Sequence, residues 1–106
     1  MGWPFSSAAA PSFDSGFTTV PAAPTNPPNA DSVSTFWLMG GSFANEGDDD
    51  AYVLLTDGSD KAVLPDLLIP AHDILRPPPE WPFMPIVGLK WSCTKQTVTG
   101  KLWGYV

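Results

Sequence analysis

The two stretches that decide the fold are Ile86-Val-Gly-Leu-Lys-Trp-Ser-Cys-Thr94 and Thr97-Val-Thr-Gly-Lys-Leu-Trp-Gly-Tyr-Val106. From residue 89 to residue 94 apolar residues alternate with polar ones, which is the two-residue period of a half-buried strand. Only Lys95-Gln96 lies between the two stretches, so we predict a hairpin whose second strand is the last of the fold. Cys93, the single cysteine, is predicted to be a small buried residue of the first strand.

Strand patterns also occur earlier in the chain. Residues 32–39 are rich in β-branched and aromatic side chains, and we expect this strand to end at Gly40-Gly41. Residues 51–56 are apolar on both faces. The Asp57-Gly58 pair that follows is typical of a tight turn and predicts a second hairpin, with residues 61–64 as its other strand.

Prolines interrupt the pattern in the second half of the chain. Residues 65–75 fit either a short helix or a strand interrupted by Pro70. Residues 76–85 contain five prolines and are expected to form an extended connector, in which Trp81 and Phe83 alternate with proline.

The start of the chain is also rich in proline. The first thirty residues contain six of the thirteen prolines, no lysine or arginine, and one carboxylate. Proline lacks the backbone N–H and fixes φ, so such a segment is a poor source of strands or of core. The sequence therefore predicts an extended proline-rich arm, residues 1–31, before a mainly β domain, residues 32–106. We expect that domain to be a small antiparallel β-sandwich or barrel of about five or six strands.

The net charge of −6 is unevenly distributed. Residues 1–60 carry eight acidic and no basic side chains, whereas residues 61–106 carry five basic and three acidic ones. Such a surface repels nucleic acid, so no nucleic-acid partner is expected. Because the sequence has neither a basic and apolar leader nor an apolar run of about 18 residues, we expect no signal peptide and no membrane span. The chain is therefore expected to remain in the cytoplasm in which it is made.

Side chains that support catalysis or metal binding are few. The chain has one histidine, His72, and one cysteine, and neither lies in a motif for a nucleophile or a zinc cluster. Two acidic turns carry oxygen ligands, but their spacing does not fit the twelve-residue calcium loop. We therefore predict no enzyme activity, no cofactor and no metal site, and the weak candidates for calcium are Asp48, Asp50, Asp57 and Asp60.

Low charge and many aromatic rings favour a surface that another protein covers. Charged residues make up 15% of the chain, against about 25% in an ordinary domain, and five residues are tryptophan. Trp37, Trp91 and Trp103 fit either the core or such a surface. The residues predicted to contact a partner are Trp3, Phe5, Phe13, Phe17, Trp81 and Phe83.

In composition and layout the chain resembles the small decoration or cement proteins of tailed-phage heads, which often join a compact β body to an extended arm. The resemblance implies a virion structural protein whose arm binds neighbouring capsid subunits. The implied partner is the major capsid protein, and a homotrimer is one arrangement of the chain itself. Two alternatives stay open: a tail or head-tail connector component, and a carbohydrate- or peptide-binding module that uses the exposed rings of Trp81, Trp91 or Trp103.

Overall fold

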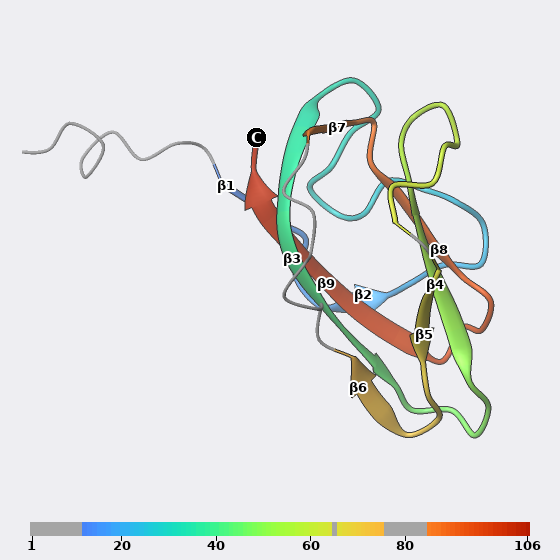
Figure 1. Ribbon diagram of the computed structural model, residues 1–106. Coiled ribbons are helices and arrows are strands. Elements are labelled where there is room, and N and C mark those ends of the chain that lie inside the picture. Colours follow the sequence, from blue (N-terminus) through green and yellow to red (C-terminus); the bar gives the residue numbers. More distant parts are fainter. Residues whose placement is uncertain (1–11, 65, 76–84) are drawn as a thin grey trace, which may run out of the picture.

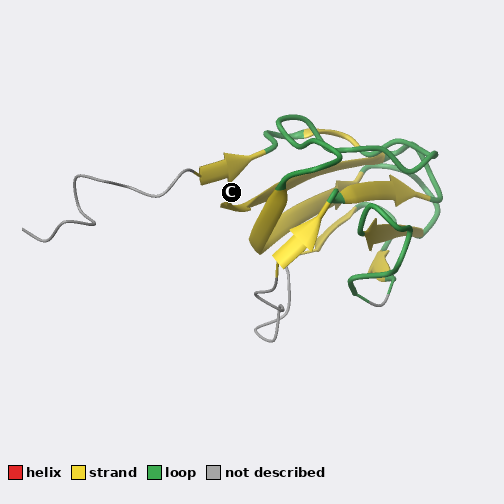
Figure 2. Cartoon of the chain, turned by 90° about the horizontal axis from the view of Figure 1, so that it is seen from above, coloured by secondary structure: helices red, strands yellow, loops and turns green. Residues whose placement is uncertain are grey.

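The computed structural model describes residues 12–64, 66–75 and 85–106. The described residues form nine strands in two antiparallel sheets and contain no helix (Figures 1 and 2). The prediction of a mainly antiparallel β fold is therefore confirmed. The two sheets have six and three strands and are not closed into a barrel.

A long central pair of strands organises the six-stranded sheet. Strand β3 (Thr35–Asn45) pairs with β9 (Val98–Tyr105) along almost its whole length. The free side of β9 pairs with two short strands, and the free side of β3 pairs with two more. These are β1 (Ser12–Asp14) and β2 (Thr18–Thr19) on β9, and β6 (Asp73–Leu75) and β7 (Pro85–Val87) on β3.

The three-stranded sheet has β4 (Ala51–Thr56) at its centre, between β5 (Leu67–Ile69) and β8 (Lys90–Cys93). Its inner face and that of the larger sheet share one core. The rings of Phe43 on β3 and Trp91 on β8 lie 6.4 Å apart between centroids, so side chains of the two sheets meet directly. Apart from Phe13 and Val20, which come from upstream, this core consists of Phe36, Leu38, Phe43, Ala51, Val53, Leu55, Ile69, Ile86, Leu89, Trp91, Cys93, Val98 and Leu102.

Strand β3 runs through Gly40-Gly41 instead of ending there, as the sequence had led us to expect. The glycines have no side chain that would collide with β9. A Cβ at Gly40 would lie 2.8 Å from Cζ2 of Trp103, and one at Gly104 would overlap the Trp37 carbonyl oxygen. A register shift between Leu38 and Gly40 accommodates this close approach, so the glycine pair marks a bulge within one long strand.

The expected hairpin between the last two strands is not formed. Strand β8 pairs with β4 and β9 pairs with β3, so the turn between them carries the chain from one sheet to the other. Both strands find antiparallel partners elsewhere, and Trp91 is thereby buried between the sheets. Periodicity identified the strands, but it does not determine which strand pairs with which.

The hairpin expected after Asp57-Gly58 is present only as a turn. Thr56 and Ala62 form an isolated bridge, and the N–H of Val63 donates to the carbonyl of Leu55 over 2.9 Å. The two edges of β4 pair with β5 and β8 instead.

Of the two patterns considered for residues 65–75, the interrupted strand is the one observed. Strands β5 and β6 flank Pro70 and lie in different sheets. The turn between them contains His72 at a φ of 56°, a left-handed conformation that redirects the chain. The connector expected at residues 76–85 lies outside the described residues, except for Pro85, which belongs to β7.

Residues 12–31, which we call the strap, lie against both sheets instead of forming part of a separate arm. Phe13 and Val20 are 3% and 0% exposed in the core. The N–H of Val20 donates to the Val98 carbonyl of the larger sheet over 2.9 Å, and the N–H of Cys93 in the smaller sheet donates to the Pro21 carbonyl over 2.8 Å. Prolines are tolerated because their carbonyls still accept hydrogen bonds. Residues 12–31, which were expected in the arm, therefore pack as part of the body, and residues 1–11 lie outside the described part.

Candidate functional site

The central strands of the six-stranded sheet, β3 and β9, carry four large apolar side chains on their outward side, which we call the aromatic face: Trp37, Met39, Trp103 and Tyr105. Each of them is between 38% and 47% exposed. The outward side of an antiparallel sheet is usually polar. A group of exposed rings on this side is therefore the feature of the described surface that most favours a binding role.

The alternation of β3 and β9 places these side chains together. Trp37 and Tyr105 are direct cross-strand partners, and Gly40, which follows Met39, is opposite Trp103. The ring of Trp103 lies over Gly40, where a side chain would leave it no room. The bulge thus brings the rings of two strands onto one patch, and the glycine fixes where the Trp103 ring rests.

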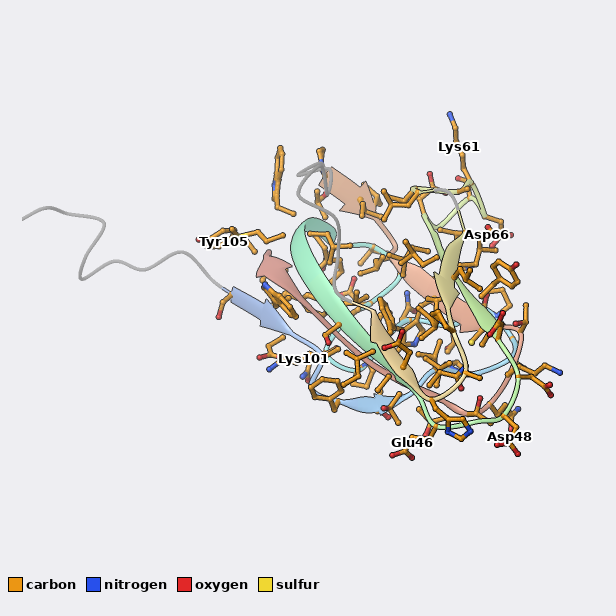
Figure 3. All side chains as sticks on the ribbon, turned by 60° about the horizontal axis from the view of Figure 1, so that its bottom comes forward. Glu46, Asp48, Lys61, Asp66, Lys101 and Tyr105 are labelled. Carbon is orange, nitrogen blue, oxygen red and sulfur yellow. The ribbon has the colours of Figure 1, made fainter. Side chains whose placement is uncertain are left out.

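A shallow hollow of about 350 Å³ adjoins the aromatic face and is lined by its Met39, Trp103 and Tyr105. Asp14 and Lys101 border the same hollow and form an ion pair, with 3.3 Å between Oδ2 and Nζ. Lys101 and Tyr105 are labelled in Figure 3 on the side of the molecule where β1 and β9 lie. Polar groups at the rim and rings beside them are the arrangement of a binding surface.

Local hydrogen bonds keep the Asp14 carboxylate ionised. The backbone N–H of Gly16 donates to Oδ1 of Asp14 over 2.8 Å, and this bond, followed by Lys101, holds the pKa of Asp14 below its ordinary value of 3.8. The carboxylate therefore presents a fixed negative charge beside the rings. The hollow thus offers an ion pair beside aromatic and thioether side chains, which are groups that a bound partner can contact.

The residues that we predicted to contact a partner fall into three groups: one is buried, one is exposed, and four lie outside the described residues. Phe13 is buried in the core of its own chain, where its ring packs 4.9 Å from that of Phe36 between centroids. Phe17 is 62% exposed between β1 and β2 and is not one of the four residues of the aromatic face. The other four lie outside the described residues: Trp3, Phe5, Trp81 and Phe83.

The three tryptophans that fitted either the core or a surface also divide. Trp91 is 1% exposed and fills the core, whereas Trp37 and Trp103 are on the aromatic face. The exposure of Trp37 could have been inferred from the sequence, because Trp37 lies between Phe36 and Leu38 in a strand and neighbouring residues of a strand point to opposite faces. Met39 and Tyr105 were missed because the expected end of the strand at Gly40 and the expected last hairpin obscured the pairing of β3 with β9.

The acidic turns do not converge on one point. Asp48 meets Nε2 of His72 over 2.7 Å, and Asp60 meets Nζ of Lys90 over 3.2 Å. The Asp50 carboxylate accepts from the N–H of Ala71, and that of Asp57 accepts from two N–H groups of its own turn. Figure 3 shows Glu46 and Asp48 at one end of the molecule and Lys61 at the other. Within the described ranges, no three metal-ligating side chains come together.

One buried amide holds the acidic loop, residues 46–50. Asn45 is 2% exposed, and its Nδ2 donates to the carbonyls of Asp49 and Ile69 over 2.8 and 3.0 Å. Its Oδ1 accepts from the N–H of Gly47 and the hydroxyl of Thr97 over 2.9 and 2.7 Å. All four hydrogen-bonding positions of the amide are filled, so Asn45 is a structural residue that orders the loop.

Two further side chains were considered for chemistry in the sequence. Cys93 is buried, as predicted, and burial raises the pKa of its thiol, which keeps it protonated. His72 is exposed, and its ring contacts the carboxylate of Asp48. In the part of the chain that the structure describes, no helix is long and apolar enough to cross a membrane. No known protein family, curated protein or solved structure is significantly similar to this chain.

Proposed function

We propose that this protein is a non-enzymatic virion structural protein, a capsid decoration or cement protein or another minor capsid protein, that binds neighbouring capsid subunits. The observation that carries the proposal is the aromatic face. Its Trp, Tyr and Met side chains are the types that are enriched in protein interfaces, while the depleted types, Lys and Asp, are at its rim. The body proposed for this role is a β-sandwich, because two sheets enclose one core.

Energetics support a protein partner for this face. An exposed ring gains about 25 cal/mol for each Å² of apolar surface that a partner removes from water. Tryptophan and tyrosine are the residues whose truncation most often costs 2 kcal/mol or more at an interface. A few such residues held on a rigid sheet can anchor a subunit that has little other surface to offer.

Co-purification with virions tests the proposal. Virions from a producing culture would be banded by density, and the copies of the chain per particle would be compared for wild type, the double variant Trp37→Ala and Trp103→Ala, and a control. The control is Tyr52→Ala, since Tyr52 is a comparably exposed ring on the smaller sheet. We expect the control to match wild type and the double variant to lose at least tenfold in occupancy. Absence of the wild-type chain from particles would refute the proposal.

Immunogold labelling of the same particles separates head decoration from a connector. Label over the whole head supports a decoration protein, whereas label at one vertex or along the tail supports the connector or tail alternative. The distinction matters because the proposal assigns many copies to the head surface.

A second candidate function is carbohydrate binding, and one observation favours it. Trp103 lines a hollow that is also lined by Asp14 and Lys101, whose head groups can bond to sugar hydroxyls. Of the other rings considered for this role, Trp91 is buried and Trp81 lies outside the described residues. Titration with soluble oligosaccharides would support this candidate if binding were lost in Trp103→Ala and kept in Tyr52→Ala.

A further inference from the structure

The described chain begins beside the aromatic face. Strand β1 lies beside the end of β9 (Figure 1) and runs antiparallel to it. Its first residue, Ser12, pairs with Tyr105. The aromatic face and the hollow next to it are thus within one residue of the point where residues 1–11 join the body. Residues 1–11 therefore join the body next to the aromatic face.

The sequence of residues 1–11 suits an aromatic surface. It has no charged side chain, and it contains Trp3, Pro4 and Phe5. Proline-rich segments dock in grooves lined by aromatic side chains, because the extended conformation is preformed and little entropy is lost on binding. Eleven residues in that conformation span about 34 Å at roughly 3.1 Å each, enough to cross a sheet face of a neighbouring molecule.

The direction of the chain favours a neighbour over the same molecule. To cover its own face, the segment would have to reverse immediately before Ser12. Pro11 occupies that position, its ring fixes φ, and it restricts Ala10 to extended conformations. We propose that residues 1–11 of one copy dock on the aromatic face of a second copy, with Trp3 and Phe5 beside Trp103 and Met39.

This inference rests on the proposed function and names one of the neighbouring subunits that it invokes: the subunit that covers the aromatic face is a second copy of the chain. Reciprocal exchange of the segments closes a dimer in which each copy gives one segment and receives one. Exchange in one direction around a ring closes a trimer or a larger ring. Both arrangements cover the aromatic face in every copy.

A cross-linking experiment on the full chain tests the contact. Two populations would be made in a Cys93→Ser background, one with Gly2→Cys and the other, carrying a heavy isotope, with Thr35→Cys. Thr35 is exposed on β3, two residues from Trp37 on the same side. The matched control replaces Thr35→Cys by Gln96→Cys, which is exposed at the turn before β9. After mixing, every cross-link between the two populations joins different molecules.

We expect the 2–35 cross-link in at least tenfold higher yield than the 2–96 cross-link. It should fall at least tenfold when Trp3→Ala and Phe5→Ala are added to the first population, and also when Trp103→Ala is added to the second. Trp103→Phe should restore part of the yield, and thermal unfolding would show that each variant is folded. A 2–35 yield no higher than the 2–96 yield would overturn the inference.

The mass of the purified protein in solution gives the second readout. Light scattering should find a dimer or a trimer for the wild type, and a monomer for the Trp3→Ala, Phe5→Ala variant. A wild type that is monomeric at 100-fold dilution and at the highest soluble concentration alike would refute the exchange. Since the proposed function is measured by virion occupancy, a monomeric chain that still enters virions would refute this inference alone.

Discussion

The strap and the acidic loop both lie outside the long central strands of the two sheets, yet they are held to the body in different ways. The strap buries Phe13 and Val20 in the core and bonds to both sheets through its backbone. The acidic loop buries no apolar side chain of its own and depends on the amide of Asn45. The strap can therefore be long and rich in proline, because it needs only a few widely spaced anchors.

One substitution tests whether the strap is anchored through the core. Phe13→Ala removes a ring that is 3% exposed and packs on Phe36, and we expect it to lower the free energy of unfolding by about 3–5 kcal/mol. Phe17→Ala is the matched control, because Phe17 is 62% exposed, and its effect should stay within about 0.5 kcal/mol. Urea unfolding followed by tryptophan fluorescence measures both. Equal effects would show that the strap is not anchored through the core.

The acidic loop should respond to the loss of its amide. Asn45→Ala leaves the buried carbonyl of Ile69 without that donor, so we expect a loss of about 2–3 kcal/mol in the free energy of unfolding. Thr97→Val removes one of the four hydrogen bonds and should cost about 1 kcal/mol. Hydrogen exchange in residues 46–50 should rise in Asn45→Ala. Unchanged exchange there would contradict the role assigned to Asn45.

The end of the strap should make stability depend on pH. The hydroxyl of Ser34, and then the N–H groups of Ser34 and Val33, bond to the Asp31 carboxylate and hold its pKa below the ordinary value of 3.8. Because the folded state binds this proton less readily than the unfolded chain, the stabilisation is complete above about pH 4 and is lost as the pH falls through the folded pKa. The difference between the urea midpoints of wild type and Asp31→Asn should be largest near pH 6 and should shrink as the pH falls below about 4. A constant difference would contradict the assignment.

The smallest effect is expected on the surface of the acidic loop. Asp48 and His72 are 94% and 63% exposed in their side chains, and ion pairs of this kind contribute little. Asp48→Asn should change the free energy of unfolding by less than about 0.5 kcal/mol. A larger loss, removed by added salt, would show that the pair helps to hold the loop.

The sequence predicted the strands better than it predicted their partners. Residues 51–56 and the alternation around Trp91 were assigned as strands, and both are strands. The pairing of the last two strands was predicted wrongly because a short link between two strands always allows a hairpin. In the structure β8 and β9 lie in different sheets, and Trp91 is buried between them. The glycine pair at 40–41 was wrongly predicted to end the strand. Glycine occurs at turns, but it also occurs within strands where a neighbouring strand or side chain comes close.

The strap and the aromatic face were harder to infer for different reasons. Phe13 and Val20 occur singly among small residues and prolines, so neither creates a period that indicates burial. The aromatic face combines residues from two strands far apart in the sequence, and only their pairing brings Trp37 next to Tyr105. The alternation in residues 35–39 alone indicates two of its four residues, Trp37 and Met39.

The pairing of β1 with β9 has a consequence for synthesis of the chain. Residues 12–14 leave the ribosome before their partners, residues 103–105, which are made about ninety residues later. At about 5–20 residues per second, Phe13 and Val20 remain without a binding site for roughly 5–20 s. Contacts this far apart in sequence also make folding slow. The nascent strap is therefore the segment on which a chaperone would have the longest time to act.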